Sequence, residues 1–214
     1  MPPQNSDSRK PRKRQRQEDR RRQTREKIFR ASVQVLVEHG YHNFTSDLLI
    51  KKAGISRGAV TNYYPNKKML LLAISRQMIE EATARSIKRS AIPTKKDDIL
   101  SKFLVEARSF FWSDYYVAMI EVYVCTRHDD EIAAQFLDLQ KKQLQTMNSI
   151  WVGRFREAGV ASRIAKNVIK LTSHFFRGVA LEASIQGTTP DESCLYEWEK
   201  IARAEWMTNK TAEK

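Results

Sequence analysis

Three polar residues and a glycine on one face of a short predicted helix are the most promising chemical group in this 214-residue sequence. In that helix Val60 and Tyr64 lie four residues apart and are expected, with Ile55, to face a core. The opposite face then carries Arg57, Gly58, Thr61 and Asn62. Arg bonds guanine, Asn bonds adenine, the Thr methyl contacts thymine, and Gly admits the backbone to the groove. The pattern indicates a surface that reads DNA base edges. An ordinary polar helix surface is the alternative for these residues alone.

Two short helices joined by a Gly-containing turn must position this face. Thr45 offers an N-cap hydroxyl to a helix over 48–53, Gly54 ends that helix, and Ser56 caps the next one immediately. A turn of three or four residues that contains Gly sets two helices near a right angle. The spacing therefore predicts a helix-turn-helix. The negative charge of Asp47 lies at the N-terminus of the first helix, where it interacts favourably with the positive end of the helix dipole.

The rest of the sequence is helical in pattern, which predicts an all-α fold. Apolar residues at helical spacing predict a helix over 24–39, and a long helix over 67–89 follows the helix-turn-helix. Five more helices are predicted at 97–112, 114–127, 129–157, 161–186 and 192–208. We expect three parts: an arm over 1–23, a three-helix helix-turn-helix domain over 24–66, and a large helical domain over 67–214.

Positive charge is concentrated in the first third of the sequence. Residues 1–30 contain twelve Lys or Arg against four Asp or Glu, and residues 31–68 contain five against two. Eleven of the thirteen net positive charges therefore lie there, which points to a polyanion partner, most simply nucleic acid. An acidic membrane surface is the competing polyanion. Membrane-binding helices, however, interleave their bases with bulky apolar residues, and residues 9–23 contain none.

Residues 1–23 form a basic arm that has no aliphatic residue after Met1. Such an arm cannot bury an apolar face, so we predict that it is disordered in the free protein. It leads directly into the predicted helix-turn-helix, which favours nonspecific contact with DNA through the minor groove or by counterion release. A solubilising tail and a nuclear-localisation-like cluster are the alternatives.

Three short motifs run through the helix-turn-helix: Phe44-Thr45, the run Ala53-Gly54-Ile55-Ser56-Arg57-Gly58-Ala59, and Tyr63-Tyr64-Pro65-Asn66-Lys67 with Leu70. Together they resemble the DNA-binding domain of the tetracycline-repressor (TetR) family over residues 24 to about 72. The resemblance implies a homodimeric transcriptional regulator, usually a repressor, which a small molecule bound in the large domain releases from DNA. Thr61 stands where the family commonly has Tyr, so the operator sequence does not follow by analogy.

The resemblance also implies how the DNA backbone is held. By matching position, four residues would contact phosphates: Thr45 and Ser46 at the N-terminus of one helix, Lys67 at the N-terminus of another, and Tyr63. Helix N-termini also bind anions on physical grounds. A solvated charge is the alternative for Lys67. The complete set of expected DNA-binding residues is Thr45, Ser46, Arg57, Gly58, Thr61, Asn62, Tyr63 and Lys67.

Polar residues interrupt the apolar stripes of the large domain. Gln140 and His174 are these two polar residues. The same stripes carry aromatic and Met residues, which are suited to lining a pocket for an apolar or aromatic compound. Core packing is the alternative for each of these residues singly. The candidate ligand-binding residues are Tyr116, Met119, Tyr123, Gln140, Met147, Trp151 and His174.

The predicted helix over 161–186 is apolar on two faces, so one face can cover the core and the other a second chain. The last helix adds a further apolar stripe, and the two helices suit a two-fold, four-helix dimer interface. Full burial within one chain is the alternative. The candidate interface residues are Val168, Phe175, Val179, Leu195, Trp198 and Ala202.

Other classes of protein fit the sequence poorly. The four His residues have no metal-ligand spacing, and neither a nucleophile motif nor a phosphate-binding loop is present, so we expect no catalytic residue, metal or cofactor. No apolar run approaches the roughly 20 residues of a membrane helix, and the basic N-terminus lacks the apolar segment of a secretory signal. We expect a cytoplasmic, nucleoid-associated bacterial protein.

These observations predict a dimeric, sequence-specific DNA-binding regulator. The expected protein is a repressor that a small, largely apolar or aromatic ligand releases from a palindromic operator in double-stranded DNA. The alternative is an architectural or ligand-independent DNA-binding protein with no effector pocket. That alternative predicts a large domain without a cavity of ligand size.

Overall fold

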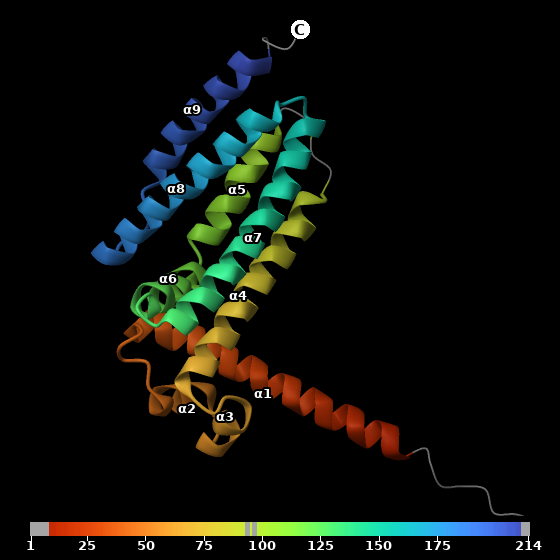
Figure 1. The fold of residues 1–214 in the computed structure, drawn as a ribbon, viewed down its shortest axis with the longest axis vertical. Coiled ribbons are helices and arrows are strands. Elements are labelled where there is room, and N and C mark those ends of the chain that lie inside the picture. The colour runs from red at the N-terminus through yellow and green to blue at the C-terminus, as the bar shows by residue number, and fades with distance from the viewer. Residues whose placement is uncertain (1–8, 93–94, 96–97, 211–214) are drawn as a thin grey trace, which may run out of the picture. The chain divides into compact units, whose positions relative to one another are not determined.

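The computed structural model describes residues 9–92, 95 and 98–210, and in this part of the chain every regular element is an α-helix (Figure 1). The prediction of an all-α fold is confirmed. The helices are α1 (Arg9–His39), α2 (Ser46–Ala53), α3 (Arg57–Tyr63), α4 (Lys67–Ser90), α5 (Ile99–Phe111), α6 (Asp114–Thr126), α7 (Asp130–Glu157), α8 (Ser162–Gln186) and α9 (Glu192–Lys210).

The chain divides into two compact units, which meet in sequence between Ile74 and Ser75. The small unit contains α1, α2, α3 and the start of α4, and the large unit contains the rest of α4 and α5 to α9. Because α4 is one uninterrupted helix, it belongs to both units. The division into an arm, a DNA-binding domain and a large domain at residues 23 and 66 stays a prediction.

α1 is much longer than predicted. It begins at Arg9, fifteen residues before the expected start at Thr24, so the prediction of disorder is wrong for residues 9–23. The prediction for residues 1–8 lies outside the described residues. Arg, Lys, Gln and Glu are good helix formers, and extending an existing helix avoids the cost of nucleation. Pro11 falls in the first turn, where the helix needs no N–H donor.

The core of the small unit forms where α1, α2 and α3 pack on one another. Ile28 and Leu36 of α1 and Leu49 of α2 are fully buried, and Val60 of α3 is 7% exposed. Phe44, in the loop between α1 and α2, is buried with them. Burying one such side chain stabilises the fold by about 1.5–3 kcal/mol. This small core therefore determines the position of α3.

Three helices, α5, α7 and α8, form the centre of the large unit, and α6 and α9 pack against them. Trp151 and Phe155 of α7 are buried, and both meet the ring of Phe103 from α5 edge to face, with centroids 5.2 and 5.5 Å apart. Edge-to-face contact is a favoured aromatic geometry. Each of the five helices from α5 to α9 begins and ends within two residues of its predicted bounds.

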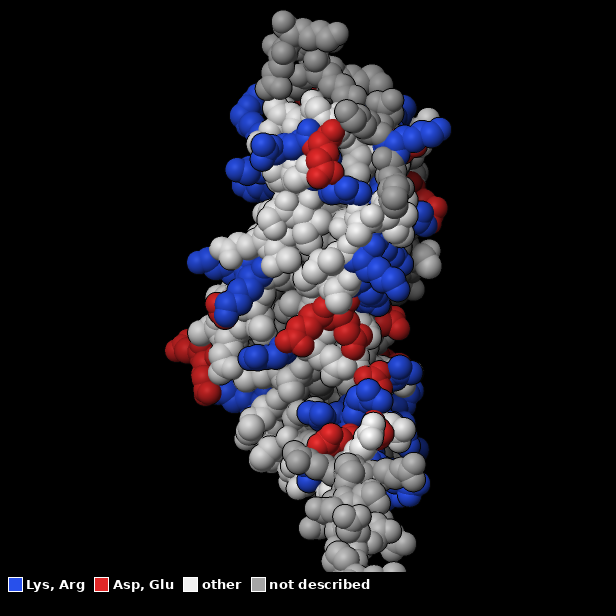
Figure 2. Space-filling model, turned by 90° about the vertical axis from the view of Figure 1, so that its right-hand side faces the viewer, with Lys and Arg blue, Asp and Glu red and all other residues white. Residues whose placement is uncertain are grey.

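The outer faces of the helices are charged. On the face drawn in Figure 2, Lys and Arg side chains lie interspersed with Asp and Glu side chains. Within the described ranges, none of the helices combines the length and the apolar character that crossing a membrane requires.

Candidate nucleic-acid interface and ligand cavity

Local capping sets the turn between α2 and α3. Thr45 Oγ1 accepts a hydrogen bond from the Leu48 N–H at 3.3 Å, and Ser56 Oγ accepts one from the Ala59 N–H at 3.2 Å. Gly54, between the two helices, has φ 63° and ψ 39°, a left-handed conformation that residues with a Cβ adopt only at a cost. The predicted caps and the Gly turn are confirmed, and they fix the direction of α3 relative to α2.

The predicted reading face of α3 is open to solvent. Arg57, Gly58, Thr61 and Asn62 are exposed, while Val60 on the other side is buried. A Cβ built on Gly58 would meet no atom within 4 Å, so packing inside the chain does not require glycine there. That these residues read bases stays a prediction, but the described part of the chain leaves their surface uncovered.

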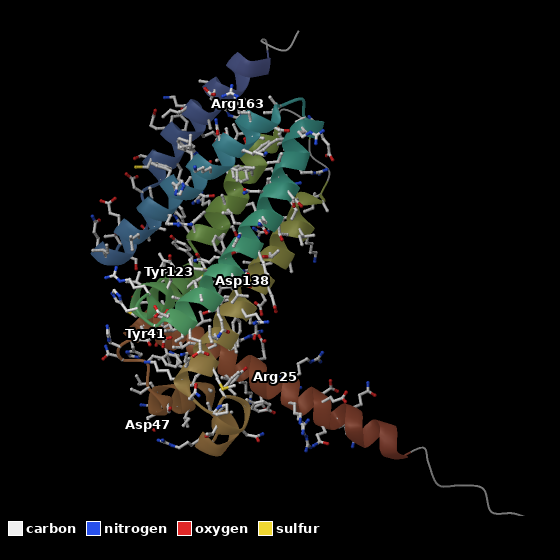
Figure 3. The ribbon with its side chains drawn as sticks, viewed as in Figure 1. Arg25, Tyr41, Asp47, Tyr123, Asp138 and Arg163 are labelled. Carbon is white, nitrogen blue, oxygen red and sulfur yellow. The ribbon has the colours of Figure 1, made fainter. Side chains whose placement is uncertain are left out.

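An ion pair holds Arg57 in place. Its guanidinium contacts the carboxylate of Asp47, which lies in the first turn of α2 (Figure 3). Both side chains are more than two-thirds exposed, at 68% and 80%. Exposed pairs stabilise a fold by only about 0–1 kcal/mol. A guanine or a phosphate can therefore compete for the guanidinium at little cost to the fold.

Lys67, at the start of α4, also has a defined position. Its Nζ donates a hydrogen bond to the Tyr41 carbonyl oxygen at 2.9 Å and lies 4.2 Å from the centroid of the Tyr41 ring. A cation above an aromatic ring gains about 0.5–1 kcal/mol at an exposed site. Lys67 is thus a positioned cation. Tyr41, which the sequence reasoning missed, is the residue that positions it (Figure 3).

The remaining candidates for the DNA backbone lie at helix ends. Thr45 and Ser46 are exposed at the start of α2, and Tyr63 is half-buried at the end of α3. The ring centroids of Tyr63 and Tyr64 are 6.4 Å apart, and burial raises the pKa of the Tyr64 hydroxyl. All eight predicted DNA-binding residues thus lie between the N-cap of α2 and the start of α4, and none is buried.

A second residue missed by the sequence reasoning ties α2 to α1. Lys52 Nζ lies 2.7 Å from Glu38 Oε1, and the hydrogen bond from Lys52 holds the pKa of the Glu38 carboxyl below its usual value. The two residues are fourteen positions apart on different helices. Helical periodicity within one element therefore gives no signal for the pair.

A cavity of about 600 Å³ lies in the large unit, lined by α4, α5, α6, α7 and α8. Pockets for small molecules commonly measure about 300–1,000 Å³. Figure 3 shows Tyr123 on α6, one of the wall residues. The structure brings all seven predicted ligand-binding residues to the wall of this cavity: Tyr116, Met119, Tyr123, Gln140, Met147, Trp151 and His174.

Most of the cavity wall is aromatic or aliphatic, with a few polar groups. Tyr116 is 3% exposed, and its hydroxyl makes no hydrogen bond with the described residues. Burial raises the pKa of Tyr116 to about 12, although the nearby Arg177 guanidinium opposes the rise. Glu106, also in the wall, is paired at 2.9 Å with Arg89 of α4. Such a lining suits a largely apolar ligand that carries a hydrogen-bonding group.

Comparison with known proteins places the helix-turn-helix in a family. Residues 28–74 match the family of bacterial regulatory proteins described as the tetR family. The HTH-type transcriptional regulator CymR of Pseudomonas putida is 28% identical over 171 residues, which are 80% of this chain and 84% of CymR. The helix-turn-helix of this chain is therefore similar to that of the tetR family. The proteins of that family and CymR are transcriptional regulators and not enzymes.

Solved structures share the fold of this chain. A TetR transcription regulator from Haloarcula marismortui matches with a TM-score of 0.63 at 20% identity, over 87% of this chain and 97% of that protein. The regulator FadR of Bacillus subtilis, in complex with stearoyl-CoA, matches with a TM-score of 0.62 at 15% identity, over 84% and 96%. At these identities the likeness concerns the fold alone.

The six residues predicted for a dimer interface divide into two groups. Val168 and Ala202 are only 3% and 2% exposed within the chain, so neither has surface to offer a partner, and the structure corrects the prediction for both. Phe175 and Trp198 stack on each other with centroids 5.5 Å apart, and Trp198 Nε1 donates to Thr172 Oγ1 at 2.9 Å. These two, with Val179 and Leu195, remain partly exposed and stay predictions.

The most exposed apolar side chains of α8 and α9 are not among the six residues predicted for the dimer interface. Leu171 and Ile185 of α8 are 54% and 77% exposed, and Tyr196 and Ile201 of α9 are 64% and 59% exposed. Leu171 and Ile185 are fourteen residues apart, with Gly178 midway, so they share a helix face. This spacing in the sequence indicates an exposed apolar face, but α8 has a second apolar face, and periodicity alone does not tell which of the two is exposed.

Proposed function

We propose that this protein is a dimeric repressor that reads a palindromic operator with α3 and leaves it when a ligand fills the cavity of the large unit. The exposed reading face of α3, capped and held in place by α1 and α2, carries the proposal. Two-fold symmetry of the protein requires two-fold symmetry of the DNA. The centres of the half-sites should then lie about 34–36 Å apart, or a multiple of that.

The proposed dimer uses exposed faces of α8 and α9. Leu171 and Ile185 would contact the second chain together with the exposed parts of Phe175 and Trp198. Gly178 lies between the first two, and a Cβ built on it would meet no atom within 4 Å. A partner helix can therefore approach closely there. The interface would be isologous, with the same faces of both chains in contact.

The proposed ligand is largely apolar or aromatic. The cavity of about 600 Å³ supports an effector and disfavours the alternative, an architectural DNA-binding protein without one. A fold relative is described in complex with stearoyl-CoA, so this fold admits a small-molecule ligand. Thermal unfolding in the presence of candidate apolar compounds separates the two hypotheses, because a ligand that binds only the folded state raises the melting temperature.

The proposed release acts through α4. This one helix begins at Lys67, beside the helix-turn-helix, and carries Ala82 and Ser86 into the cavity wall. A ligand that binds better when α4 is displaced would shift the population away from the DNA-binding form. Lys67 and α3 would then no longer fit the operator.

Selection of binding sites from random DNA, followed by footprinting, tests the DNA-binding half of the proposal. We expect the recovered sites to be two-fold symmetric and the footprint to cover both half-sites. Recovery of a single asymmetric half-site would contradict a dimer on a palindrome. Failure to enrich any sequence would contradict base reading by α3 itself.

A further inference from the structure

A stripe of basic residues follows the N-terminal half of α1. Arg16, Arg20, Gln23 and Lys27 lie at spacings of four, three and four, which places them on one helix face. We call Arg16, Arg20 and Lys27 the basic stripe. All three are exposed, and Arg9 and Lys13 occupy the same register nearer the start of the helix.

Two acidic residues of this part of α1, Asp19 and Glu26, lie on a neighbouring stripe of the helix. Asp19 pairs with Arg22 at 3.4 Å, and Glu26 pairs with Arg30 at 2.6 Å. These four residues follow one another at spacings of three or four, so they form a second stripe in which charges of both signs compensate. The basic stripe contains no acidic position.

The basic stripe is carried by the same unit as α3. Ile28, the residue after Lys27, is fully buried and begins the part of α1 that packs against α2 and α3. The N-terminal half of α1 extends away from these two helices as a straight continuation (Figure 1). At 1.5 Å per residue, the helix from Arg16 to Lys27 measures about 17 Å. A helix of this length holds its charges at a fixed distance from the reading face.

We propose that the basic stripe binds the phosphate backbone of DNA beside the half-site that α3 reads. The inference rests on the proposed function, because it assumes that α3 docks on DNA. Each strand of the duplex carries one phosphate per 3.4 Å of axis, so a stripe of about 17 Å can follow about five base pairs of flanking DNA. A membrane surface fits the stripe less well, since residues 9–23 carry no bulky apolar side chain to insert.

Two variants with the same change in net charge test the proposal. The arm variant is Arg16→Gln with Arg20→Gln, and Gln keeps the helix propensity of Arg. The control variant is Arg163→Gln with Lys166→Gln, two exposed residues of α8 in the large unit. Affinity is measured for the selected operator alone and for the operator extended by about 10 base pairs on each side, at several salt concentrations.

We expect the extension to tighten binding of the wild type and the control but not of the arm variant. If each substituted Arg neutralises one phosphate, a dimer of the arm variant neutralises four fewer phosphates, and its salt slope falls by about 3.6. Between about 50 and 200 mM salt, the wild type should then lose about 150-fold more affinity than the arm variant. Circular dichroism should show that both variants remain folded, because all four substituted residues are exposed.

Three results would decide against the inference or against its premise. An arm variant that keeps the flank effect and the wild-type slope overturns the inference and leaves the proposed function intact. Binding to phosphatidylglycerol vesicles that depends on the arm, without any flank effect on DNA, overturns it in favour of a membrane surface. If the wild type prefers no sequence, the proposed function fails. The salt slopes on a duplex of arbitrary sequence then still decide whether the stripe binds phosphates.

Discussion

Replacing Asn62 and Lys67 separately by Ala should separate base reading from backbone contact. Asn62 is exposed on α3, and Lys67 is held beside Tyr41 at the start of α4. A good bidentate contact to the correct base contributes about 1–3 kcal/mol of discrimination. With one contact per half-site and two half-sites, Asn62→Ala should weaken operator binding by about 2–6 kcal/mol, at least roughly 30-fold.

Lys67→Ala should act on all sequences alike. Without one phosphate-binding cation in each protomer, the salt slope of a dimer falls by about 1.8. Between about 50 and 200 mM salt, the variant should therefore lose about 12-fold less affinity than the wild type. Its fold should weaken by about 1–2 kcal/mol, because Ala can neither donate a hydrogen bond to the Tyr41 carbonyl nor place a cation above the Tyr41 ring.

The assay is fluorescence anisotropy with the selected operator and with operators changed at one base pair per half-site, below the melting temperature of both variants. Asn62→Ala should flatten the preference at one position and leave the salt slope unchanged. Lys67→Ala should keep every preference. If Lys67→Ala changed which base is preferred and Asn62→Ala did not, the assignment of the reading face to α3 would be refuted.

Three further substitutions test other parts of the structure. Ser56→Ala removes the N-cap of α3 and should cost about 1 kcal/mol in urea unfolding, and an unchanged midpoint would show that the cap contributes nothing. Tyr116→Phe removes a buried hydroxyl that makes no hydrogen bond with the described residues, so the melting temperature should hold or rise while affinity for a ligand with an acceptor group falls. A marked loss of stability would instead show that the nearby Arg177 guanidinium interacts with the hydroxyl. The pKa of Glu38 is lower in the folded state than its usual value of 4.5. The pairing of Glu38 with Lys52 therefore stabilises the fold fully at pH values above 4.5, and this stabilisation is lost as the pH falls through the lowered pKa. The stability difference between wild type and Glu38→Gln should therefore be constant near neutral pH and shrink in acid, and a difference that grew in acid would contradict the ion pair.

The helix-turn-helix could be predicted from the sequence because its determinants are local. Thr45, Gly54 and Ser56 each act within four residues of their own position, by capping a helix or by adopting a left-handed conformation. The side of α3 that faces the core follows in the same way from the spacing of Val60 and Tyr64. The seven cavity residues were found because polar and aromatic residues interrupted otherwise apolar stripes, and the cavity gathers all of them.

Features that depend on contacts between distant segments could not be predicted. The pairing of Lys67 with Tyr41 spans twenty-six residues and involves a backbone carbonyl, for which no sequence pattern exists. Because α8 has two apolar faces, the sequence does not determine which face packs against the core. Val168 lies on the buried face. The length of α1 was missed for another reason. Residues 9–23 contain no aliphatic or aromatic residue, so hydrophobic periodicity gives no sign of their helix. Helix propensity and ion pairs such as Asp19 with Arg22 support it.

The link between the cavity and the DNA is tested most directly by titrating one ligand into the protein with and without operator. The ligand is a compound that raises the melting temperature, and calorimetry gives its affinity in both titrations. Because coupling between two sites is reciprocal, operator should weaken ligand binding by the same factor by which the ligand weakens operator binding. Equal ligand affinities with and without operator would contradict the account, because they would show that the cavity does not control the DNA.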